Sequence, residues 1–468
     1  MPCHFSQTAL VKGVQTIKMG KLFGTDGIRG IANKELTASL AFKTGQCGAY
    51  VLTKHTKGRR PRILIGKDTR KSGDMLEAAL TAGLCSVGVK VIPLGVIPTP
   101  AVAYLTRYYK ADAGVVISAS HNPCEYNGIK FFNGDGYKLS DAIEDEIEAY
   151  ITGEKEIGEL PTHGKVGYVS ANHNAVEDYV SFAVSTIDCR LDGMKIAVDC
   201  ANGASYETAF KALNKLGANV EAIHNTPDGV NINSMCGSTH MESLQAYVKS
   251  IGADVGIAFD GDADRMLAVD ENGKLIDGDK VMAICAKYMQ ENGTLKQNTL
   301  VATVMSNLGL FIAGEKLGIN IPRTKVGDRY VLEEMLANGY NIGGEQSGHI
   351  IFLDHNTTGD GLVSALQFLA VLKKTGMKAS EAASIVEVLP QVLCNATVKP
   401  ENKNSYMEVA EIADACAALE KEFAGEGRVL IRPSGTEPLV RVMIEGKDQE
   451  YIAKKAKELA DMIEKLLG

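Results

Sequence analysis

The hydrophobic positions of this 468-residue chain form short runs that alternate with helical patterns. In the first block the run RILIG (62–66) precedes a helical pattern at 74–88, and the runs KVIPLG (90–95) and AGVVIS (113–118) follow. Short apolar runs that alternate with helices of about three turns are typical of βαβ units, whose parallel strands are buried on both faces. The pattern therefore predicts an α/β fold.

Two later blocks repeat this element order with different residues. The second block begins at KIAVDCANGAS (195–205) and the third at TLVATV (299–304), and a helical pattern follows each start. We interpret the likeness as internal repetition of one domain. In each block a late strand ends in a polar loop, SASHNP, DGDADR or GEQSGH. Ligands of parallel α/β sheets bind at strand ends, so the three loops are expected to face one central cleft.

The pattern changes near residue 387. Two strand-like runs flank the turn RPSGTEP, and helical patterns cover 405–423 and 448–467. This order is typical of a smaller α+β domain. The acidic helical stretch 141–160 and the polar region 161–176 are interpreted as the junction of the first two domains. The prediction is an α/β protein of three similar βαβ-type domains with mixed, mostly parallel sheets and a C-terminal α+β domain, bounded at 19–172, 173–272, 273–386 and 387–468.

Composition narrows the class of protein. Hydrophobic residues make up 45% of the chain, charged residues 23%, and no apolar run approaches the roughly 18 residues that span a bilayer. A net charge of −8 disfavours nucleic acid and acidic membranes as partners, so an anionic small molecule would need a local basic pocket.

The ten cysteines and the N-terminal segment bear on location. The cysteines form no C-x-x-C pair and no cluster with histidine in the sequence, which argues against disulfides and zinc and for thiols in a reducing cytoplasm. Residues 1–18 lack the apolar core of a secretory signal, and we interpret them as an arm or an upstream start of open role.

The loop DGDADR predicts a metal site. Asp260, Asp262 and Asp264 alternate along it, so a turning backbone can bring three carboxylates to one hard cation, for which Mg²⁺ is the natural choice. The spacing also imitates an EF-hand loop, but Arg265 stands where that loop needs glycine. Capping of turns is the alternative role for these aspartates.

The turn RPSGTEPLVR predicts a phosphate cradle. It offers two guanidinium groups, two hydroxyls and glycine-exposed N–H groups, which suit the several acceptor oxygens of a phosphate. The residues concerned are Arg432, Ser434, Gly435, Thr436 and Arg441. An ordinary hairpin turn with two surface arginines is the alternative.

Two further loops carry weaker signals. GTDGIRG places Arg29 between glycines, which let the backbone approach a ligand closely. GEQSGH presents Glu345, Ser347 and His349, a set of donors and acceptors that suits sugar hydroxyls. The alternative for this second loop is a turn around a satisfied histidine.

The stretch VISASHNPCEYNGIK contains two serines, Ser118 and Ser120, that could carry chemistry. No G-x-S-x-G elbow surrounds either serine, which disfavours a hydrolase nucleophile. A serine near three aspartates and a metal is better suited to carry a phosphate, because the cation neutralises the phosphoserine charge. Lys130 is a candidate proton donor or acceptor, with an ordinary surface lysine as the alternative.

With these loops assembled, the chain resembles the α-D-phosphohexomutase family from about Lys21 to its C-terminus. The resemblance implies that Ser120, rather than Ser118, is the phosphorylated serine. It implies a Mg²⁺ ion held by the Ser120 phosphate together with Asp260, Asp262 and Asp264. It further implies a reacting centre lined by Arg29, Lys130 and His349, and substrate contacts from Glu345, Ser347, Arg265, Lys325, Arg432, Ser434, Gly435, Thr436 and Arg441.

The activity implied by the resemblance is a double phosphoryl transfer through a phosphoserine enzyme and a sugar bisphosphate. The loops are most similar to those of bacterial members acting on glucosamine phosphates, with Gln346 where members acting on glucose or mannose phosphates more often have methionine. Glucosamine 1,6-bisphosphate is then the expected intermediate or activator. Activity on glucose or mannose phosphates and a non-catalytic phosphosugar-binding protein are the alternatives, and a homodimer would fit the resemblance.

One residue departs from the family pattern. Ala263 stands in the metal loop where the family usually has glycine. If this position has positive φ, the added Cβ costs about 1 kcal/mol or more. The exact geometry of the loop is thereby in question, although the identity of its ligands is not.

Overall fold

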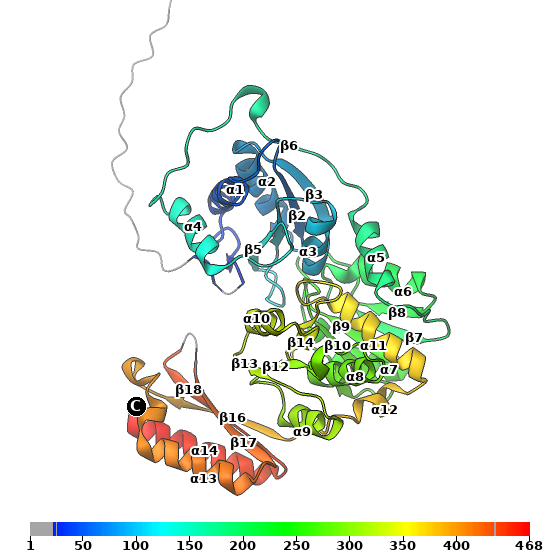
Figure 1. The fold of residues 1–468 in the computed structure, drawn as a ribbon, viewed down its shortest axis with the longest axis vertical. Coiled ribbons are helices and arrows are strands. Elements are labelled where there is room, and N and C mark those ends of the chain that lie inside the picture. Colours follow the sequence, from blue (N-terminus) through cyan, green and yellow to red (C-terminus); the bar gives the residue numbers. More distant parts are fainter. Residues whose placement is uncertain (1–21, 25, 435–436) are drawn as a thin grey trace, which may run out of the picture.

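The computed structural model describes residues 22–24, 26–434 and 437–468, which form four sheets with flanking helices (Figure 1). Domain I contains six strands in the order β1-β5-β4-β2-β3-β6. The strands are β1 (Ile28–Ile31), β2 (Arg62–Lys67), β3 (Lys90–Val96), β4 (Ala113–Ile117), β5 (Tyr126–Asn133) and β6 (Tyr168–Val169). The helices are α1 (Ala38–Thr53), α2 (Ser72–Ser86), α3 (Thr99–Tyr108) and α4 (Asp141–Ile151).

Domain II contains a five-stranded sheet in the order β11-β10-β9-β7-β8. The strands are β7 (Lys195–Asp199), β8 (Asn219–Ile223), β9 (Val255–Phe259), β10 (Met266–Asp270) and β11 (Leu275–Ile276). Its helices are α5 (Ala175–Ser185), α6 (Ser205–Lys215) and α7 (Glu242–Ile251).

Domain III contains a four-stranded sheet in the order β13-β12-β14-β15. The strands are β12 (Val301–Thr303), β13 (Arg323–Thr324), β14 (Ile342–Gly344) and β15 (Ile350–Phe352). Its helices are α8 (Gly278–Glu291), α9 (Leu308–Leu317), α10 (Asp328–Asn338), α11 (Gly361–Thr375) and α12 (Ala379–Ala383).

Domain IV is an antiparallel sheet, β16-β18-β17, with two helices. The elements are β16 (Gln391–Thr397), β17 (Gly427–Pro433), β18 (Leu439–Gly446), α13 (Ala410–Phe423) and α14 (Gln449–Leu467). Short 3-10 helices in connecting segments of the described chain cover His163–Lys165, Gly237–Thr239, Lys296–Asn298, Pro400–Asn402 and Tyr406–Glu408.

The first three domains share one sheet topology. Their orders β3-β2-β4-β5, β8-β7-β9-β10 and β13-β12-β14-β15 are equivalent, with three parallel strands followed by one antiparallel strand. The chain reverses direction between the third and fourth strands of this motif, and that reversal is the polar loop in each domain. The predicted repetition, the mixed sheets and the smaller C-terminal domain are confirmed.

The hydrophobic cores show which domains pack together. One buried cluster includes residues of domains I, II and III, among them Val102, Phe259 and Phe368. A second cluster lies on the other face of the domain I sheet, so that sheet is covered on both faces. Domain IV has its own core, around Ile444 and Ile463.

Two predicted helices have different bounds in the structure. The helix expected at 141–160 ends at Ile151, because Gly153 adopts a φ of 84° that α-helix does not allow. The helix expected at 405–423 begins at Ala410, after a short 3-10 turn. Within the described chain, no helix combines the length and apolar character needed to cross a membrane.

Candidate active site

The loop after β4 presents Ser120 to the aspartates of the loop after β9. Ser120 has a φ of 52°, which is uncommon for a residue with a side chain, and only 2% of its surface is exposed. Its hydroxyl donates a hydrogen bond to Oδ2 of Asp260 over 2.7 Å. The hydroxyl of Ser118 instead points away from the aspartates and donates to Asp68. The loop geometry thus distinguishes the two serines.

The three aspartates of the DGDADR loop form a cluster that fits a hard cation. One oxygen from each of Asp260, Asp262 and Asp264 lies within 4.8 Å of the others, and all three residues are buried. The Oδ1 atoms of Asp262 and Asp264 are buried and accept no hydrogen bond. Buried carboxylate oxygens without partners are costly, and a divalent cation with oxygen ligands would satisfy them. The donor set therefore fits Mg²⁺.

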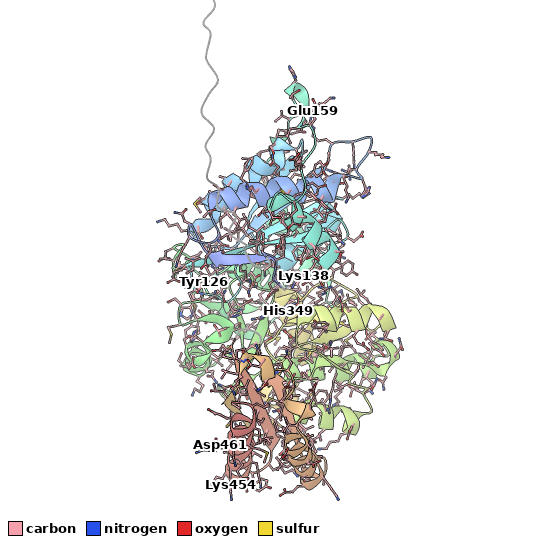
Figure 2. The ribbon with its side chains drawn as sticks, turned by 90° about the vertical axis from the view of Figure 1, so that its left-hand side faces the viewer. Tyr126, Lys138, Glu159, His349, Lys454 and Asp461 are labelled. Carbon is pink, nitrogen blue, oxygen red and sulfur yellow. The ribbon has the colours of Figure 1, made fainter. Side chains whose placement is uncertain are left out.

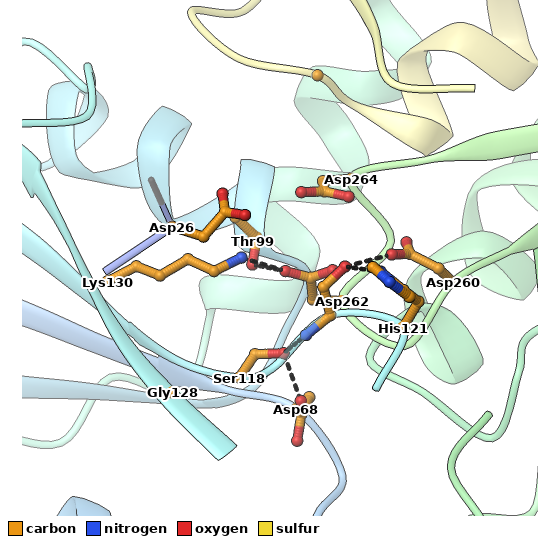
Figure 3. A network of polar contacts seen from close by, with 12 residues as sticks. Asp26, Asp68, Thr99, Ser118, His121, Gly128, Lys130, Asp260, Asp262 and Asp264 are labelled. Carbon is orange, nitrogen blue, oxygen red and sulfur yellow. Dashed lines mark hydrogen bonds and ion pairs between the residues drawn. The ribbon is translucent and has the colours of Figure 1, made fainter. Parts of the chain in front are cut away.

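Lys130, on β5, reaches this cluster from domain I. Its Nζ lies 3.0 Å from Oδ2 of Asp262, and the hydroxyl of Thr99 donates to the same oxygen over 2.7 Å (Figure 3). Only 3% of Lys130 is exposed, so the alternative of a surface lysine is wrong.

The pKa values of two carboxylates in the cluster shift in opposite directions. Burial, followed by the charges of Asp264 and Asp262, raises the pKa of Asp260 well above its ordinary value. Burial would also raise the pKa of Asp262, but Lys130 and the hydrogen bond from Thr99 hold that pKa below its ordinary value. The Lys130 ammonium thus keeps Asp262 ionised.

His349 and Lys138 lie where domain I meets domain III (Figure 2). The His349 ring lies 3.6 Å from Asp264 and 3.4 Å from Asp328. Burial lowers the pKa of this imidazole, yet the two carboxylates raise it above its ordinary value overall. Lys138 donates to Asp26 over 3.1 Å and to Asp328 over 2.6 Å, and so joins domains I and III across the site.

Ser120, Lys130, Asp264 and His349 line a cleft of about 570 Å³, whereas Asp260 and Asp262 are not among its lining residues. The residues of our sequence prediction that line it are Arg29, Ser120, Lys130, Asp264, Arg265, Glu345 and His349. Oε1 of Glu345 accepts a hydrogen bond from the Gly327 N–H over 3.1 Å. Ser347 and Lys325 are exposed and are not among the residues that line this cleft.

The predicted phosphate cradle lies on the β17–β18 hairpin of domain IV, apart from the lining of the cleft. Arg432 and Arg441 stand directly opposite each other in the sheet register. Burial, and then the charge of Arg441, lowers the pKa of Arg432. Like charges facing each other across strands are unfavourable, and an anion between them would relieve the repulsion. Ser434 is buried beside them, while Gly435 and Thr436 lie outside the described residues.

Comparisons with known proteins identify the fold as one family. Four family models for phosphoglucomutase/phosphomannomutase match the chain: alpha/beta/alpha domain I at 20–158, domain II at 176–273, domain III at 277–389 and the C-terminal domain at 393–462. A phosphoglucosamine mutase of Ruminiclostridium cellulolyticum is 64% identical over 95% of this chain and 99% of the relative. The chain belongs to the phosphoglucomutase/phosphomannomutase family.

Other relatives agree with this membership. A phosphoglucosamine mutase of Acetivibrio thermocellus is 63% identical over 96% of this chain and all of the relative. A crystal structure of a phosphoglucomutase/phosphomannomutase family protein from Burkholderia thailandensis matches with a TM-score of 0.76 at 24% identity, covering 94% of this chain and 96% of that one. At that identity the structural likeness shows the fold alone.

The positive φ considered for Ala263 is present in the structure. Ala263 adopts a φ of 56°, a left-handed conformation in which a Cβ is strained. The three aspartates still converge, so this loop conformation is compatible with the carboxylate cluster.

Several residues in or beside the cleft were not predicted from the sequence. Asp26, Lys138 and Asp328 form the ion pairs described above, and His121 lies 2.9 Å from Arg265 Nη1 and 3.3 Å from the Ser120 hydroxyl. Asp26 and His121 stand inside motifs that we had singled out, GTDGIRG and SASHNP. Lys138 and Asp328 carry no local signal, because their proximity arises only when domains I and III pack together.

A group in domain II corrects one expectation. The sequence shows no cysteine–histidine cluster, yet the fold brings Cys236 and His224 to Asp199, with potential ligand atoms within 4.8 Å. Asp199 Oδ2 accepts from His224 Nδ1 over 2.9 Å and from the Gly237 N–H, and Oδ1 accepts from the Ala201 N–H. These hydrogen bonds satisfy the buried carboxylate and fix the turn after β7.

Proposed function

We propose that this protein is a phosphoglucosamine mutase, which interconverts glucosamine 6-phosphate and glucosamine 1-phosphate. Support comes from relatives of that name that are 61–64% identical over at least 95% of the chain. The single structural observation that carries the proposal is the approach of the Ser120 hydroxyl to the DGDADR aspartates, at the edge of a cleft of sugar-phosphate size.

Ser120 carries the phosphate in this proposal. Its oxygen is buried, held by Asp260 and next to His121, and it faces the cleft that would hold the sugar. The phosphoserine would transfer its phosphate to O1 of glucosamine 6-phosphate, and Ser120 would then take back the phosphate from O6 of the resulting 1,6-bisphosphate. Both transfers conserve the phosphate, so no water and no external acceptor is consumed.

Asp260, Asp262 and Asp264 would hold a Mg²⁺ ion beside that phosphate. When bound, the cation neutralises phosphate charge and so favours attack at phosphorus. A crystal structure of the N-acetylphosphoglucosamine mutase of Aspergillus fumigatus in complex with GlcNAc-6P and magnesium has the same fold, with a TM-score of 0.68.

The remaining cleft residues bind and orient the sugar. Lys130 accepts or donates the proton of the reacting hydroxyl, because it is buried and faces the cleft beside Ser120. Arg29, Arg265 and His349 supply positive charge around the transferred phosphate. Arg432, Ser434 and Arg441 of domain IV bind the other phosphate once the hairpin approaches the cleft.

A coupled assay tests this function. Purified protein with Mg²⁺ and a trace of glucosamine 1,6-bisphosphate is expected to convert glucosamine 6-phosphate with a higher kcat/KM than glucose or mannose phosphates. Intact mass would report one phosphate, which the Ser120→Ala variant lacks together with its turnover. Equal or better rates on glucose or mannose phosphates would assign the chain to those substrates instead. Turnover that survives in Ser120→Ala would exclude the phosphoserine carrier.

A further inference from the structure

Two side chains that do not line the cleft donate hydrogen bonds to the backbone of Ser120. The Ser120 carbonyl oxygen accepts from Nη2 of Arg70 over 3.1 Å and from Nδ2 of Asn233 over 2.9 Å. The same two side chains also donate to the carbonyl oxygen of Asn122, over 2.5 and 3.1 Å. Two donors thus hold both ends of the turn that contains Ser120 and His121. Neither donor is among the residues that line the cleft.

The two donors come from different domains. Arg70 follows β2 in domain I, is 2% exposed and is oriented by an ion pair with Asp68. Asp68 also accepts from the Ser118 hydroxyl, which in turn accepts from the Ser120 N–H over 3.0 Å. The N–H and the carbonyl of Ser120 are therefore both fixed by this network.

Asn233 belongs to domain II, in the segment between β8 and α7. Its own N–H donates to the Ala201 carbonyl over 2.9 Å, and its φ is 56°. Both partners of its side chain are carbonyl oxygens, which can only accept, so the amide must present its NH₂ group to them. Two more hydrogen bonds, Lys71 N–H to the Gly229 carbonyl and the Thr69 hydroxyl to the Asn202 carbonyl, join the same segments of domains I and II.

The DGDADR loop, which we call the metal loop, also contacts the Ser120 carbonyl and the Asn233 side chain. A Cβ placed on Gly261, between Asp260 and Asp262, would lie 2.6 Å from the Ser120 carbonyl oxygen and 2.7 Å from Asn233 Nδ2. Only glycine allows this approach. The phosphoserine loop, the metal loop and the Asn233 segment therefore meet at one contact, and the position of Ser120 relative to Asp260 depends on it.

We propose that Asn233 and Arg70 are positioning residues for phosphoryl transfer, which hold the strained Ser120 turn so that Oγ stays at the metal loop. This inference rests on the proposed function for its substrate. A residue with a side chain leaves positive φ readily unless its surroundings hold it there. Rotation of the turn would move Oγ away from Asp260. Because phosphoryl transfer depends on alignment more than on covalent participation by the protein, such a shift reduces kcat without changing contacts to the sugar.

Two substitutions of Asn233 test the proposal with residues that tolerate its positive φ. Asn233→Gly removes the amide and tolerates positive φ, and Asn233→Asp keeps the shape but replaces the donor by an acceptor. Ser234→Ala is the matched control, since Ser234 is exposed in the same segment. Arg70→Lys keeps the charge and removes the Nη2 group that donates to both carbonyls.

We expect both Asn233 variants and Arg70→Lys to lower kcat about 10- to 100-fold while KM for glucosamine 6-phosphate stays within about threefold. Ser234→Ala is expected to match the wild type. The Tm of the Asn233→Gly variant should remain within a few degrees of the wild type. A residue with only a structural role would instead show a Tm that falls together with its activity. A kcat within twofold of the wild type in a folded Asn233→Gly or Asn233→Asp variant would overturn the proposal.

A second measurement tests the positioning role independently of which sugar phosphate the enzyme uses. The rate at which glucose 1,6-bisphosphate phosphorylates Ser120, followed by intact mass, is expected to fall by the same factor in the Asn233 variants. If wild-type protein is phosphorylated but does not turn over glucosamine 6-phosphate, the proposed function fails while the positioning role is still decided by this rate. An unchanged phosphorylation rate in both Asn233 variants would refute the positioning role. If Arg70→Lys fails to fold, the Asn233 variants decide alone.

Discussion

The Ser120 hydroxyl and Oδ2 of Asp260 are 2.7 Å apart, although they are 140 residues apart in the chain and lie in different domains. The contact depends on the packing of domain I against domain II through a shared core. It places a candidate phosphate carrier at the edge of three buried carboxylates, and the first prediction concerns this pair.

Replacing Asp260 by asparagine keeps its size and removes its negative charge. We expect Asp260→Asn to lower kcat at least about 100-fold and to shift the Mg²⁺ dependence to higher concentration, because one of three anionic ligands is lost. The measurement is the mutase rate over a Mg²⁺ titration. Asp188→Asn, at an exposed position that pairs with Lys374, is the matched control and should behave as the wild type. An unaltered Mg²⁺ dependence in Asp260→Asn would show that Asp260 is not a ligand.

The left-handed conformation of Ala263 predicts a stabilising substitution. Relief of Cβ strain by Ala263→Gly, less the added backbone entropy of glycine in the unfolded chain, should raise stability by about 0.5–1 kcal/mol. Thermal unfolding of the wild type and the variant measures this difference in stability. Ala424→Gly is a useful comparison outside the site, since Ala424 ends α13 with a φ of 49° and should show a similar gain. A loss of stability in Ala263→Gly, with a gain in Ala424→Gly, would mean that the Ala263 side chain contributes packing that outweighs its strain.

Arg441 allows the role of domain IV to be tested. If Arg432 and Arg441 bind the phosphate that does not react, Arg441→Gln should raise KM for glucosamine 6-phosphate about tenfold or more. Phosphorylation of Ser120 by a free phosphoryl donor should be less affected. Steady-state kinetics measures KM, and intact mass measures the phosphorylation of Ser120. Arg190→Gln, at an exposed arginine of domain II, is the control. A normal KM in Arg441→Gln would place the second phosphate elsewhere.

Asp279, at the start of α8, predicts a pH-dependent stability. Burial, followed by the charge of Asp277, raises its pKa from 3.8 to about 7. The unfolded chain ionises this group above about pH 4, whereas the folded chain keeps its proton until about pH 7. Folding is therefore disfavoured progressively as pH rises through this window, by at most about 4 kcal/mol.

Asp279→Asn should remove that pH dependence. Oδ2 of Asp279 accepts from the Asn307 N–H over 2.7 Å, and an asparagine oxygen can keep this bond. We expect the variant to have a higher Tm than the wild type at pH 8 and a similar Tm near pH 4.5. Wild-type and variant curves that stay parallel over this range would show that Asp279 does not titrate in it.

Local chemistry in the sequence predicted much of the site. The alternating aspartates of DGDADR, the serine-rich turn after β4 and the strand and helix pattern of each block are properties of short segments, and the structure bears out the order of elements that they predict. These signals are readable because alternation, turn residues and periodicity act within a few residues of one another. Ser118 and Ser120 could not be told apart by residue type alone, since both are hydroxyls in the same loop.

Tertiary structure decided what those segments do together. Lys138 meets Asp328 across two domains, and Asn233 reaches the Ser120 carbonyl from a segment 113 residues away. No local pattern encodes such pairs, because they form only when domains that are distant in the chain bury a common core. The sequence determined which groups could carry a phosphate and a cation. The packing of the domains decided which serine faces the aspartates, because hydrogen bonds and ion pairs depend on distances that only the folded chain sets.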